Sequence, residues 1–229
     1  AGINLSEAGT FKDIKMDYAK IALSVRSSTL TLERGVFAQI NDTGIFASNE
    51  SVVDVSNSYF YNSNMGVVCE TQTTGRLHHN IFSTISETME SSAVVANAST
   101  IEATDNFMNS CSRGLSMLYG ANGEISHNDV ANCRVGMYNF SFDRDVLFFV
   151  TENTFSSCLE RFIEIHHAST PIIQLNNFIG STGQEYLYAF SKSLHYYEDL
   201  DATQNYWDGL PATEASRLIT DERVLKEAG

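Results

Sequence analysis

Residues 127–138, HNDVANCRVGMY, and residues 152–163, ENTFSSCLERFI, decide the fold of this chain. Both stretches carry a short polar residue, then any residue, then a large apolar one, and this order recurs seven times at spacings of 23 to 29 residues. A pattern that repeats at a nearly fixed period indicates a solenoid. The seven copies are Asn57-Ser-Tyr59, Asn80-Ile-Phe82, Asp105-Asn-Phe107, Asn128-Asp-Val130, Asn153-Thr-Phe155, Asn176-Asn-Phe178 and Asn205-Tyr-Trp207.

The stretches between the copies have the character of short strands. A glycine often follows the polar position by eight or nine residues, as Gly66, Gly114 and Gly136 do, and opens an alternating segment such as Val67-Val-Cys69. One such strand cannot bury its apolar face, whereas coils stacked about 4.8 Å apart bury it and pair every backbone amide. We therefore predict an all-β fold, a single-stranded right-handed parallel β-helix with coils of about 22–25 residues and a short C-terminal cap.

Asparagine suits the turns of such a coil. It tolerates left-handed backbone geometry, and its amide can hydrogen-bond the Asn of the next coil in a ladder. Other solenoids fit less well, because the LxxLxL consensus of leucine-rich repeats and the helical spacing of the α-repeats are both missing. A β-sandwich would not keep one motif at nearly constant spacing.

The composition limits the kinds of partner that we expect this chain to bind. The chain has 14 Lys and Arg against 28 Asp and Glu, a net charge of −14, and such a surface repels phosphate backbones. We therefore expect no nucleic-acid partner, and neutral glycans or cationic surfaces suit the charge better. No run of about 18 apolar residues occurs, so we expect no membrane insertion. The first residues, AGINLSEAGT, lack the features of a signal peptide, so we expect any export signal to have been removed or to lie upstream.

The four cysteines are Cys69, Cys111, Cys133 and Cys158. They show no CxxC or other metal-ligand spacing, so we expect no zinc. Cys111, Cys133 and Cys158 lie five or six residues after the polar positions and are expected to form a column of buried free thiols, the alternative being a disulfide between coils.

We expect one β-helix domain over residues 1–229. Residues 1–30 carry the weakest repeat and are expected to form early coils or an N-terminal cap, residues 31–209 the main coils, and residues 210–229 a C-terminal cap segment. Ala212 to Ala228 has the pattern of a short amphipathic helix.

These coils resemble the pectate-lyase-like right-handed β-helix proteins that carry parallel β-helix repeats. The resemblance covers about residues 30 to 209, and Asn205-Tyr-Trp-Asp-Gly209 is similar to the NYWG coil that often closes such solenoids, with Asp208 inserted before the glycine. The resemblance implies a fold that serves polysaccharide lyases, glycoside hydrolases, epimerases, tailspikes, adhesins and structural modules, so it does not select an activity. A lyase of this kind would need calcium on clustered Asp residues; otherwise we expect no cofactor and no metal.

Two sets of residues are candidates for chemistry. His127 and Glu152 both lie just before the polar turn position of adjacent coils, which places them about 5 Å apart and makes them a candidate acid–base pair. The alternative is a purely structural role beside the turn.

The second set follows the glycine position, where alternation would place Tyr138, Glu164, His166 and one of Tyr186 or Tyr188 on one exterior patch. Aromatic rings beside carboxylates suit sugars, because the ring contacts the C–H face and the carboxylates accept hydroxyl hydrogen bonds. The alternative is that several of these tyrosines pack in the core or in loops.

Two loops break the even spacing, residues 139–149 and residues 183–200, and insertions in solenoids usually map to the binding face. The expected ligand-binding residues are Tyr138, Asp143, Arg144, Asp145, Arg161, His166, Tyr186 and Tyr188, and the candidate catalytic residues are Glu164, His127 and Glu152.

We expect an exported or cell-surface module that recognises a carbohydrate or polysaccharide through this aromatic and acidic patch. One alternative is a polysaccharide-processing lyase or hydrolase using Glu164 or the pair His127 and Glu152. The other is a structural module that docks flanking domains or partner proteins.

Overall fold

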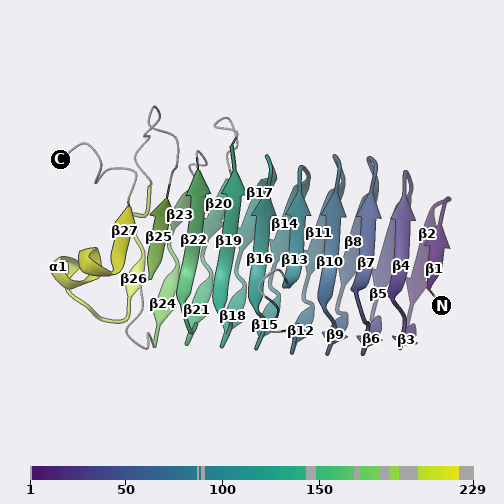
Figure 1. The fold of residues 1–229 in the computed structure, drawn as a ribbon, viewed down its shortest axis with the longest axis horizontal. Helices are drawn as coiled ribbons and strands as arrows, with labels where there is room; N and C mark the ends of the chain where they lie inside the picture. Colours follow the sequence, from purple (N-terminus) through teal and green to yellow (C-terminus); the bar gives the residue numbers. More distant parts are fainter. Residues whose placement is uncertain are drawn as a thin grey trace.

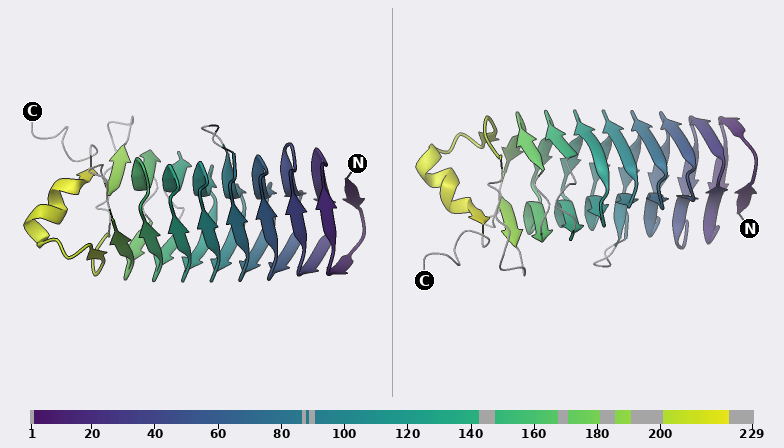
Figure 2. Two further views of the ribbon diagram at one scale, coloured as in Figure 1. Left: turned by 90° about the horizontal axis from the view of Figure 1, so that it is seen from below. Right: turned by 90° about the horizontal axis from the view of Figure 1, so that it is seen from above.

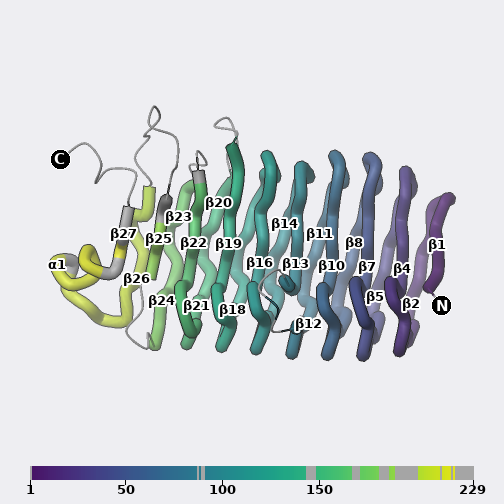
Figure 3. The backbone as a smooth tube through the Cα atoms, in the orientation of Figure 1, coloured from purple at the N-terminus to yellow at the C-terminus, as the bar shows by residue number. Residues whose placement is uncertain are grey.

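The computed structural model describes residues 2–86, 88, 91–142, 148–167, 171–180, 186–190 and 201–221. The chain winds into coils that stack along one long axis, with the N-terminus at one end and the short helix α1 (Ala212–Ala215) at the other (Figures 1 and 3). Each full coil contributes one strand to each of three sheets, and the strands of each sheet pair in parallel. The prediction of an all-β parallel solenoid is confirmed.

We name the three sheets A, B and C in the order in which the chain visits them. Sheet A contains β1 (Ile3–Leu5), β4 (Ile21–Arg26), β7 (Thr43–Ser48), β10 (Met65–Glu70), β13 (Ser92–Asn97), β16 (Arg113–Leu118), β19 (Val135–Ser141), β22 (Arg161–His167), β25 (Leu187–Phe190) and β27 (Ile219–Asp221). Sheet B contains β2 (Gly9–Lys12), β5 (Thr29–Glu33), β8 (Val52–Ser56), β11 (Thr74–His78), β14 (Thr100–Thr104), β17 (Asn122–Ser126), β20 (Phe148–Thr151) and β23 (Ile172–Gln174). Sheet C contains β3 (Lys15–Asp17), β6 (Val36–Ala38), β9 (Tyr59–Tyr61), β12 (Ile81–Ser83), β15 (Phe107–Asn109), β18 (Asp129–Ala131), β21 (Thr154–Ser156), β24 (Asn177–Ile179) and β26 (Tyr206–Trp207).

The core is a set of columns, since equivalent inward side chains lie one above another in successive coils. The rings of Phe37, Phe60 and Phe82 on sheet C stack with centroid separations of 4.8 Å. Phe178 stacks on Trp207 at 4.6 Å and continues the column at the other end. Such offset stacks add to the free energy gained by burying apolar area.

The glycines that mark the repeat make room for this column. A Cβ atom on Gly66 would lie 2.6 Å from the ring of Phe82 and 2.4 Å from the carbonyl oxygen of Ala93. Gly136 stands in the same relation to Phe155. The recurring glycine is therefore a packing requirement at the corner between sheets C and A.

The predicted asparagine ladder is present at the corner between sheets B and C, here called the B–C corner. From Asn106 onward, the Oδ1 of each ladder Asn accepts hydrogen bonds from the backbone N–H and the side-chain Nδ2 of the Asn one coil before, at 2.8–3.0 Å. The Oδ1 of Asn80 accepts from the backbone N–H of Ser58 at 2.9 Å. The ladder consists of Asn80, Asn106, Asn128, Asn153, Asn176 and Asn205.

Two of the predicted repeat positions were wrong by one residue. Ile81 pairs with both Tyr59 and Phe107, so the residues level with Asn80 are Ser58 and Asn106, and neither Asn57 nor Asp105 is in the ladder. Asn57 and Asp105 instead occupy the preceding position, where the backbone is left-handed, with φ of 50° and 54°. Both positions attract polar residues, and for this reason the sequence pattern alone placed these two coils one residue early.

The thiols are free and buried, as predicted. Cys111, Cys133 and Cys158 each lie five residues after a ladder Asn and form an inward column. Burial raises the pKa of Cys69 to about 12 and also raises the pKa of Cys158. These side chains therefore act as small apolar core residues.

The two ends differ in how they finish the stack. Residues 3–17 form the first three strands, so the N-terminal segment is coil rather than cap. At the other end α1 has four residues and is followed by a short 3-10 helix, Ser216–Leu218, after which β27 pairs with β25 (Figure 2). The helix expected over 212–228 is thus confined to this turn within the described residues, because the chain returns to sheet A at Ile219.

Candidate binding groove on sheet A

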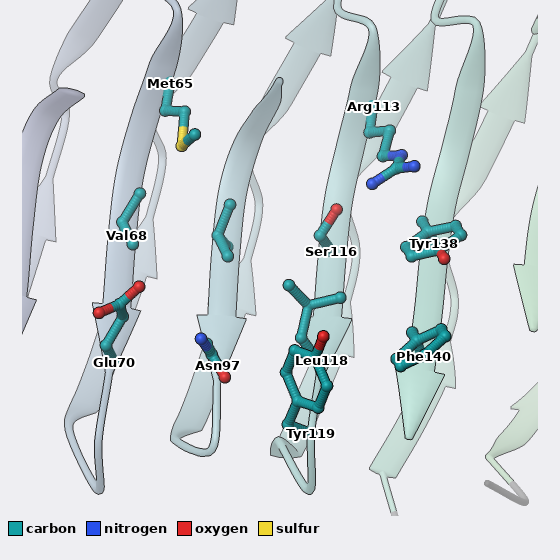
Figure 4. Close-up of a pocket in the computed structure, with 11 residues that line it drawn as sticks. Met65, Val68, Glu70, Asn97, Arg113, Ser116, Leu118, Tyr119, Tyr138 and Phe140 are labelled. Atoms are coloured by element: carbon teal, nitrogen blue, oxygen red, sulfur yellow. The ribbon is translucent and has the colours of Figure 1, made fainter. Parts of the chain in front are cut away.

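The outer face of sheet A carries a hollow with a volume of about 380 Å³, drawn in Figure 4. It lies over the middle strands β10, β13, β16 and β19. We call it the sheet A groove; it is lined by Met65, Val68, Glu70, Val95, Asn97, Arg113, Ser116, Leu118, Tyr119, Tyr138 and Phe140.

Strand register explains how these side chains meet. Val68, Val95 and Ser116 are level with one another in successive strands, and the same row continues to Tyr138. The first three are only 4%, 7% and 2% exposed. The row therefore forms a covered, mostly apolar floor that ends at an aromatic side chain.

A parallel row on the same face supplies polar groups at one end and rings at the other. Glu70, Asn97, Leu118 and Phe140 are level in this second row. Polar side chains thus lie beside the apolar floor at the N-terminal side of the groove, and rings close its C-terminal side (Figure 4).

Three rings gather where β16 and β19 leave sheet A. Tyr119 contacts Phe140 edge-on at 5.4 Å between ring centroids, and Phe140 contacts Phe142 edge-on at 5.1 Å. Tyr119 is 54% exposed and Phe142 is 66% exposed. We call Tyr119, Phe140 and Phe142 the aromatic cluster. Its exposed rings offer apolar surface directly beside the groove.

Beyond Tyr138 the floor row continues into a group of interlocked polar and aromatic side chains. Tyr138 is level with Glu164, and Glu164 is level with Tyr188. The guanidinium of Arg113 lies 3.8 Å from the ring centroid of Tyr138, and that of Arg161 lies 4.1 Å from the ring of Tyr188. These cation–π contacts fix the two rings in place.

Glu164 holds the centre of this group. Its Oε1 accepts a hydrogen bond from Nε2 of His166 at 2.6 Å, and its Oε2 pairs with Arg161 at 3.2 Å. Desolvation raises the pKa of Glu164, but the contacts with His166 and Arg161 outweigh it and hold the pKa below the ordinary value. Both oxygens are engaged and the group is ionised near neutral pH, so it suits an anchor or a base better than a proton donor.

Burial, the largest effect, raises the pKa of Tyr138. Arg113 acts in the opposite direction and Glu164 adds to the increase. The Tyr138 hydroxyl therefore stays protonated and able to donate a hydrogen bond over a wide pH range.

The structure brings together most of the predicted exterior patch. Tyr138, Glu164, His166 and Tyr188 lie side by side, with the His166 ring 5.3 Å from Tyr138 and 6.2 Å from Tyr188. Asp143, Arg144 and Asp145 lie outside the described residues.

Tyr186 does not belong to this patch. It is 2% exposed and packs in the core, with its ring centroid 4.9 Å from Phe162 and 6.0 Å from Trp207. The reason is the corner between sheets C and A: Tyr186 is level with Phe162, which is level with Gly136, and this column points inward. A ligand-binding role for Tyr186 is therefore excluded by its burial.

His127 and Glu152 are paired as the repeat predicted, with His127 Nε2 2.8 Å from Glu152 Oε2. Their side chains are 54% and 51% exposed at the B–C corner, and neither lines the sheet A groove. The pair is one of several on this edge, since His79 lies 3.9 Å from Asp105 and Arg34 lies 2.6 Å from Asp13. The repetition indicates that pairing at this corner is a regular feature of the coil.

Several lining residues were missed by the sequence reasoning. Phe140 is level with the predicted His166 one coil on, and Arg113 is level with the predicted Arg161 two coils on, so strand register would have found both. Tyr119 is level with Ser141 and had no such signal. The floor residues Val68 and Val95 gave no such signal, because an outward Val looks like core in a sequence.

No group of three or more His, Cys, Asp or Glu is placed to hold a metal ion within the described ranges. In the part of the chain that the structure describes, no helix is long and apolar enough to span a membrane.

Residues 1–148 match the family described as right-handed β-helix region, and the chain belongs to this family. The predicted handedness agrees with that family, and the three parallel sheets are its expected architecture. No curated protein and no solved structure matches the chain.

Proposed function

We propose that this protein recognises a carbohydrate chain in the sheet A groove. The observation that carries the proposal is the aromatic cluster, in which two rings, Tyr119 and Phe142, are more than half exposed at the end of a preformed hollow. A contiguous exposed apolar patch on a protein surface marks a candidate interaction site. They provide flat apolar area against which the C–H face of a sugar can pack.

The polar groups beside the rings complete the match to a sugar. Glu70 and Asn97 supply hydrogen-bond acceptors, and Asn97 and Arg113 supply donors, around a floor that is otherwise apolar. A mostly apolar hollow with a few placed polar groups is the usual form of a small-molecule or saccharide site. The net charge of −14 favours a neutral glycan over an acidic one.

The geometry favours binding over turnover. Glu164 has both oxygens engaged by neighbouring side chains and a lowered pKa, which does not suit the proton donor that glycoside hydrolysis needs. His127 and Glu152 lie at the B–C corner and do not line the groove. We also propose that the protein lies outside the cell or on its surface. The four free thiols are compatible with this location, because they are buried and need no reducing compartment.

A second candidate, docking of another protein, is favoured by one observation. Sheet C exposes a row of apolar side chains, Tyr59, Ile81 and Phe107, each 37% to 43% exposed and level in successive strands. Tyr61 stacks beside Tyr59 at 6.0 Å.

The proposal is tested first on a glycan array, with and without calcium, using the intact protein. Each glycan that binds is then incubated with the protein and examined for cleavage products. Cleavage would establish an enzyme, whereas the absence of binding to any glycan would contradict recognition and favour docking through sheet C.

The site is tested by Tyr119→Gly. Tyr119 has a left-handed backbone, φ 49°, so glycine keeps the fold while the ring is lost. We expect the affinity for the bound glycan to fall by about tenfold, the value of one aromatic contact. Tyr61→Ala on sheet C, where the ring is 39% exposed, is the control and is expected to bind normally. Equal affinities for Tyr119→Gly and the unaltered protein would remove the groove from the proposal.

A further inference from the structure

A second hollow lies at the corner where the chain passes from sheet C to sheet A, here called the C–A corner, in the N-terminal coils. Its volume is about 470 Å³, within the range of small-ligand sites. It shares no lining residue with the sheet A groove, although Asn64 of one and Met65 of the other are consecutive. We call it the corner pocket; it is lined by Tyr18, Gln39, Ile40, Asn41, Asn62, Ser63, Asn64 and Ser86.

Among the residues that the structure describes, those that line the pocket include no Asp, Glu, Lys or Arg. Four carboxamides converge here, from Gln39, Asn41, Asn62 and Asn64. A carboxamide offers two donors and one acceptor oxygen. The four amides therefore present both kinds of group and carry no charge that would select ions. Hydroxyl groups of a neutral sugar both donate and accept, and they fit such a lining.

Much of this hydrogen-bonding capacity is unused. Among the described residues, the exposed side-chain amides of Asn41 and Asn62 have no protein hydrogen-bond partner, and the buried Oε1 of Gln39 accepts none. Asn64 Oδ1 accepts from Ser91 Oγ at 2.7 Å, which orients this amide with its Nδ2 available to donate. The Gln39 Oε1 has almost no accessible surface, so the groups open to a ligand are the exposed amides of Asn41 and Asn62, together with Asn64 Nδ2.

The pocket is held in shape by the main chain of the coils. The backbone N–H groups of Gln39, Asn41 and Asn62 donate to Tyr61, Ala19 and Ser83 on neighbouring coils at 2.9–3.1 Å. Tyr18, Gln39 and Asn62 all have left-handed backbones, with φ of 58°, 54° and 52°. The backbone of these corner residues is therefore fixed, and binding has to order only their side chains.

Tyr18 gives the pocket its apolar wall. Its ring is 74% exposed although it belongs to the lining. An exposed ring beside a set of amides offers a sugar both an apolar face to pack on and hydrogen-bond partners for its hydroxyl groups.

We propose that the corner pocket is a second saccharide site, specific for a neutral sugar, which contacts the Tyr18 ring and hydrogen-bonds Asn41, Asn62 and Asn64. The proposal does not depend on binding in the sheet A groove.

The test is a titration of the ¹⁵N-labelled intact protein, followed through the side-chain NH₂ signals of asparagine and glutamine. The probes are neutral trisaccharides of glucose, mannose, galactose and xylose, with trigalacturonic acid as the charged comparison. We expect at least one neutral probe to shift the NH₂ signals of Asn41, Asn62 and Asn64, and trigalacturonic acid to shift them at least tenfold more weakly. Failure of every neutral probe to move these signals, or equal shifts from the acid, would overturn the proposal.

Two variants separate binding from folding. Tyr18→Gly and Asn62→Gly each remove a side chain at a left-handed position that glycine favours, so both are expected to fold. We expect the apparent affinity to fall about tenfold in Tyr18→Gly and several-fold in Asn62→Gly. Unchanged affinity in both would overturn the proposal.

The matched control is Asn132→Gly. Asn132 is an exposed Asn at the equivalent corner position, φ 53°, outside the pocket, and its replacement is expected to leave the titration unchanged. Tyr119→Gly distinguishes the two sites: it is expected to weaken binding in the sheet A groove while the NH₂ shifts of the corner pocket persist. Loss of those shifts in Tyr119→Gly would assign them to the groove and overturn a separate site.

Discussion

At the scale of single residues, Glu164 shows how register and charge combine. The side chain is 13% exposed, yet it remains ionised because His166 and Arg161 both contact it. Charge-assisted hydrogen bonds of this kind are about twice as strong as neutral ones. The carboxylate therefore contributes to stability and orients the neighbouring tyrosines.

A depressed pKa in the folded state predicts a pH dependence. The contribution of Glu164 is fully present above its unfolded pKa, 4.5, and is lost as the pH falls through the lower pKa of the folded state. We expect Glu164→Gln to lower the free energy of unfolding by about 1–3 kcal/mol near neutral pH, and this difference to shrink below about pH 4.5. Urea unfolding at several pH values measures it.

The control for this prediction is Glu102→Gln. Glu102 is exposed and lies 3.7 Å from Arg76, so its replacement should change stability by about 0.5 kcal/mol or less. A difference for Glu164→Gln that stays constant down to pH 3 or so would contradict the assigned cause.

Alternation in the sequence was sufficient to place Tyr138, Glu164, His166 and Tyr188 together. It failed for Tyr186, because the residue that enters sheet A from the C–A corner points inward along with the next one. Periodicity describes a strand but not the corner that begins it.

At the scale of structural elements, we expect the asparagine ladder to be the part of the coil that tolerates substitution least. Asn128 is 1% exposed, and its Nδ2 donates to the carbonyl oxygens of Ala103 and Ser126 while its Oδ1 serves Asn106. One side chain therefore satisfies backbone groups on two coils.

We expect Asn128→Ala to lower the free energy of unfolding by about 2–4 kcal/mol, since it leaves buried donors and acceptors without partners. Equilibrium unfolding in urea measures this change. Asn177→Ala, at an exposed strand position, should cost less than about 0.5 kcal/mol. Equal losses in the two variants would show that the ladder is not what stabilises the corner.

The ladder was predictable in kind but not in every position. Asn57 and Asp105 precede ladder positions and are themselves favoured by the left-handed turn, so two polar residues in succession left the register open by one. Only the pairing of the strands decides between them.

At the scale of the whole molecule, each coil contacts chiefly the coils before and after it (Figure 1). Stability in such a structure is a sum of neighbour terms, and a coil with neighbours on both sides is held most firmly. The fold was predictable because a sequence motif that recurs at nearly constant spacing indicates stacked coils directly. The sheet A groove was not fully predictable, because the outward-facing Val68 and Val95 are nearly buried and look like core residues in the sequence.

Hydrogen exchange tests this view of the whole molecule. We expect amides in β10, β13 and β16 to exchange at least tenfold more slowly than those in β1, β2 and β3, because the first coil has a neighbour on one side only. Mass spectrometry of peptides after exchange measures the rates. Uniform protection along the chain would mean that the solenoid opens as a single unit.

The left-handed residues of the B–C corner have a consequence for engineering. They place one side chain per coil on the surface, at a pitch set by the sheets, and the structure accepts Arg34, His127 and Leu175 there alike. The side chains along this edge can therefore be replaced one at a time at regularly spaced positions. Grafted groups would stand at known multiples of about 4.8 Å, a spacing suited to arranging dyes, ligands or catalytic groups in a defined line.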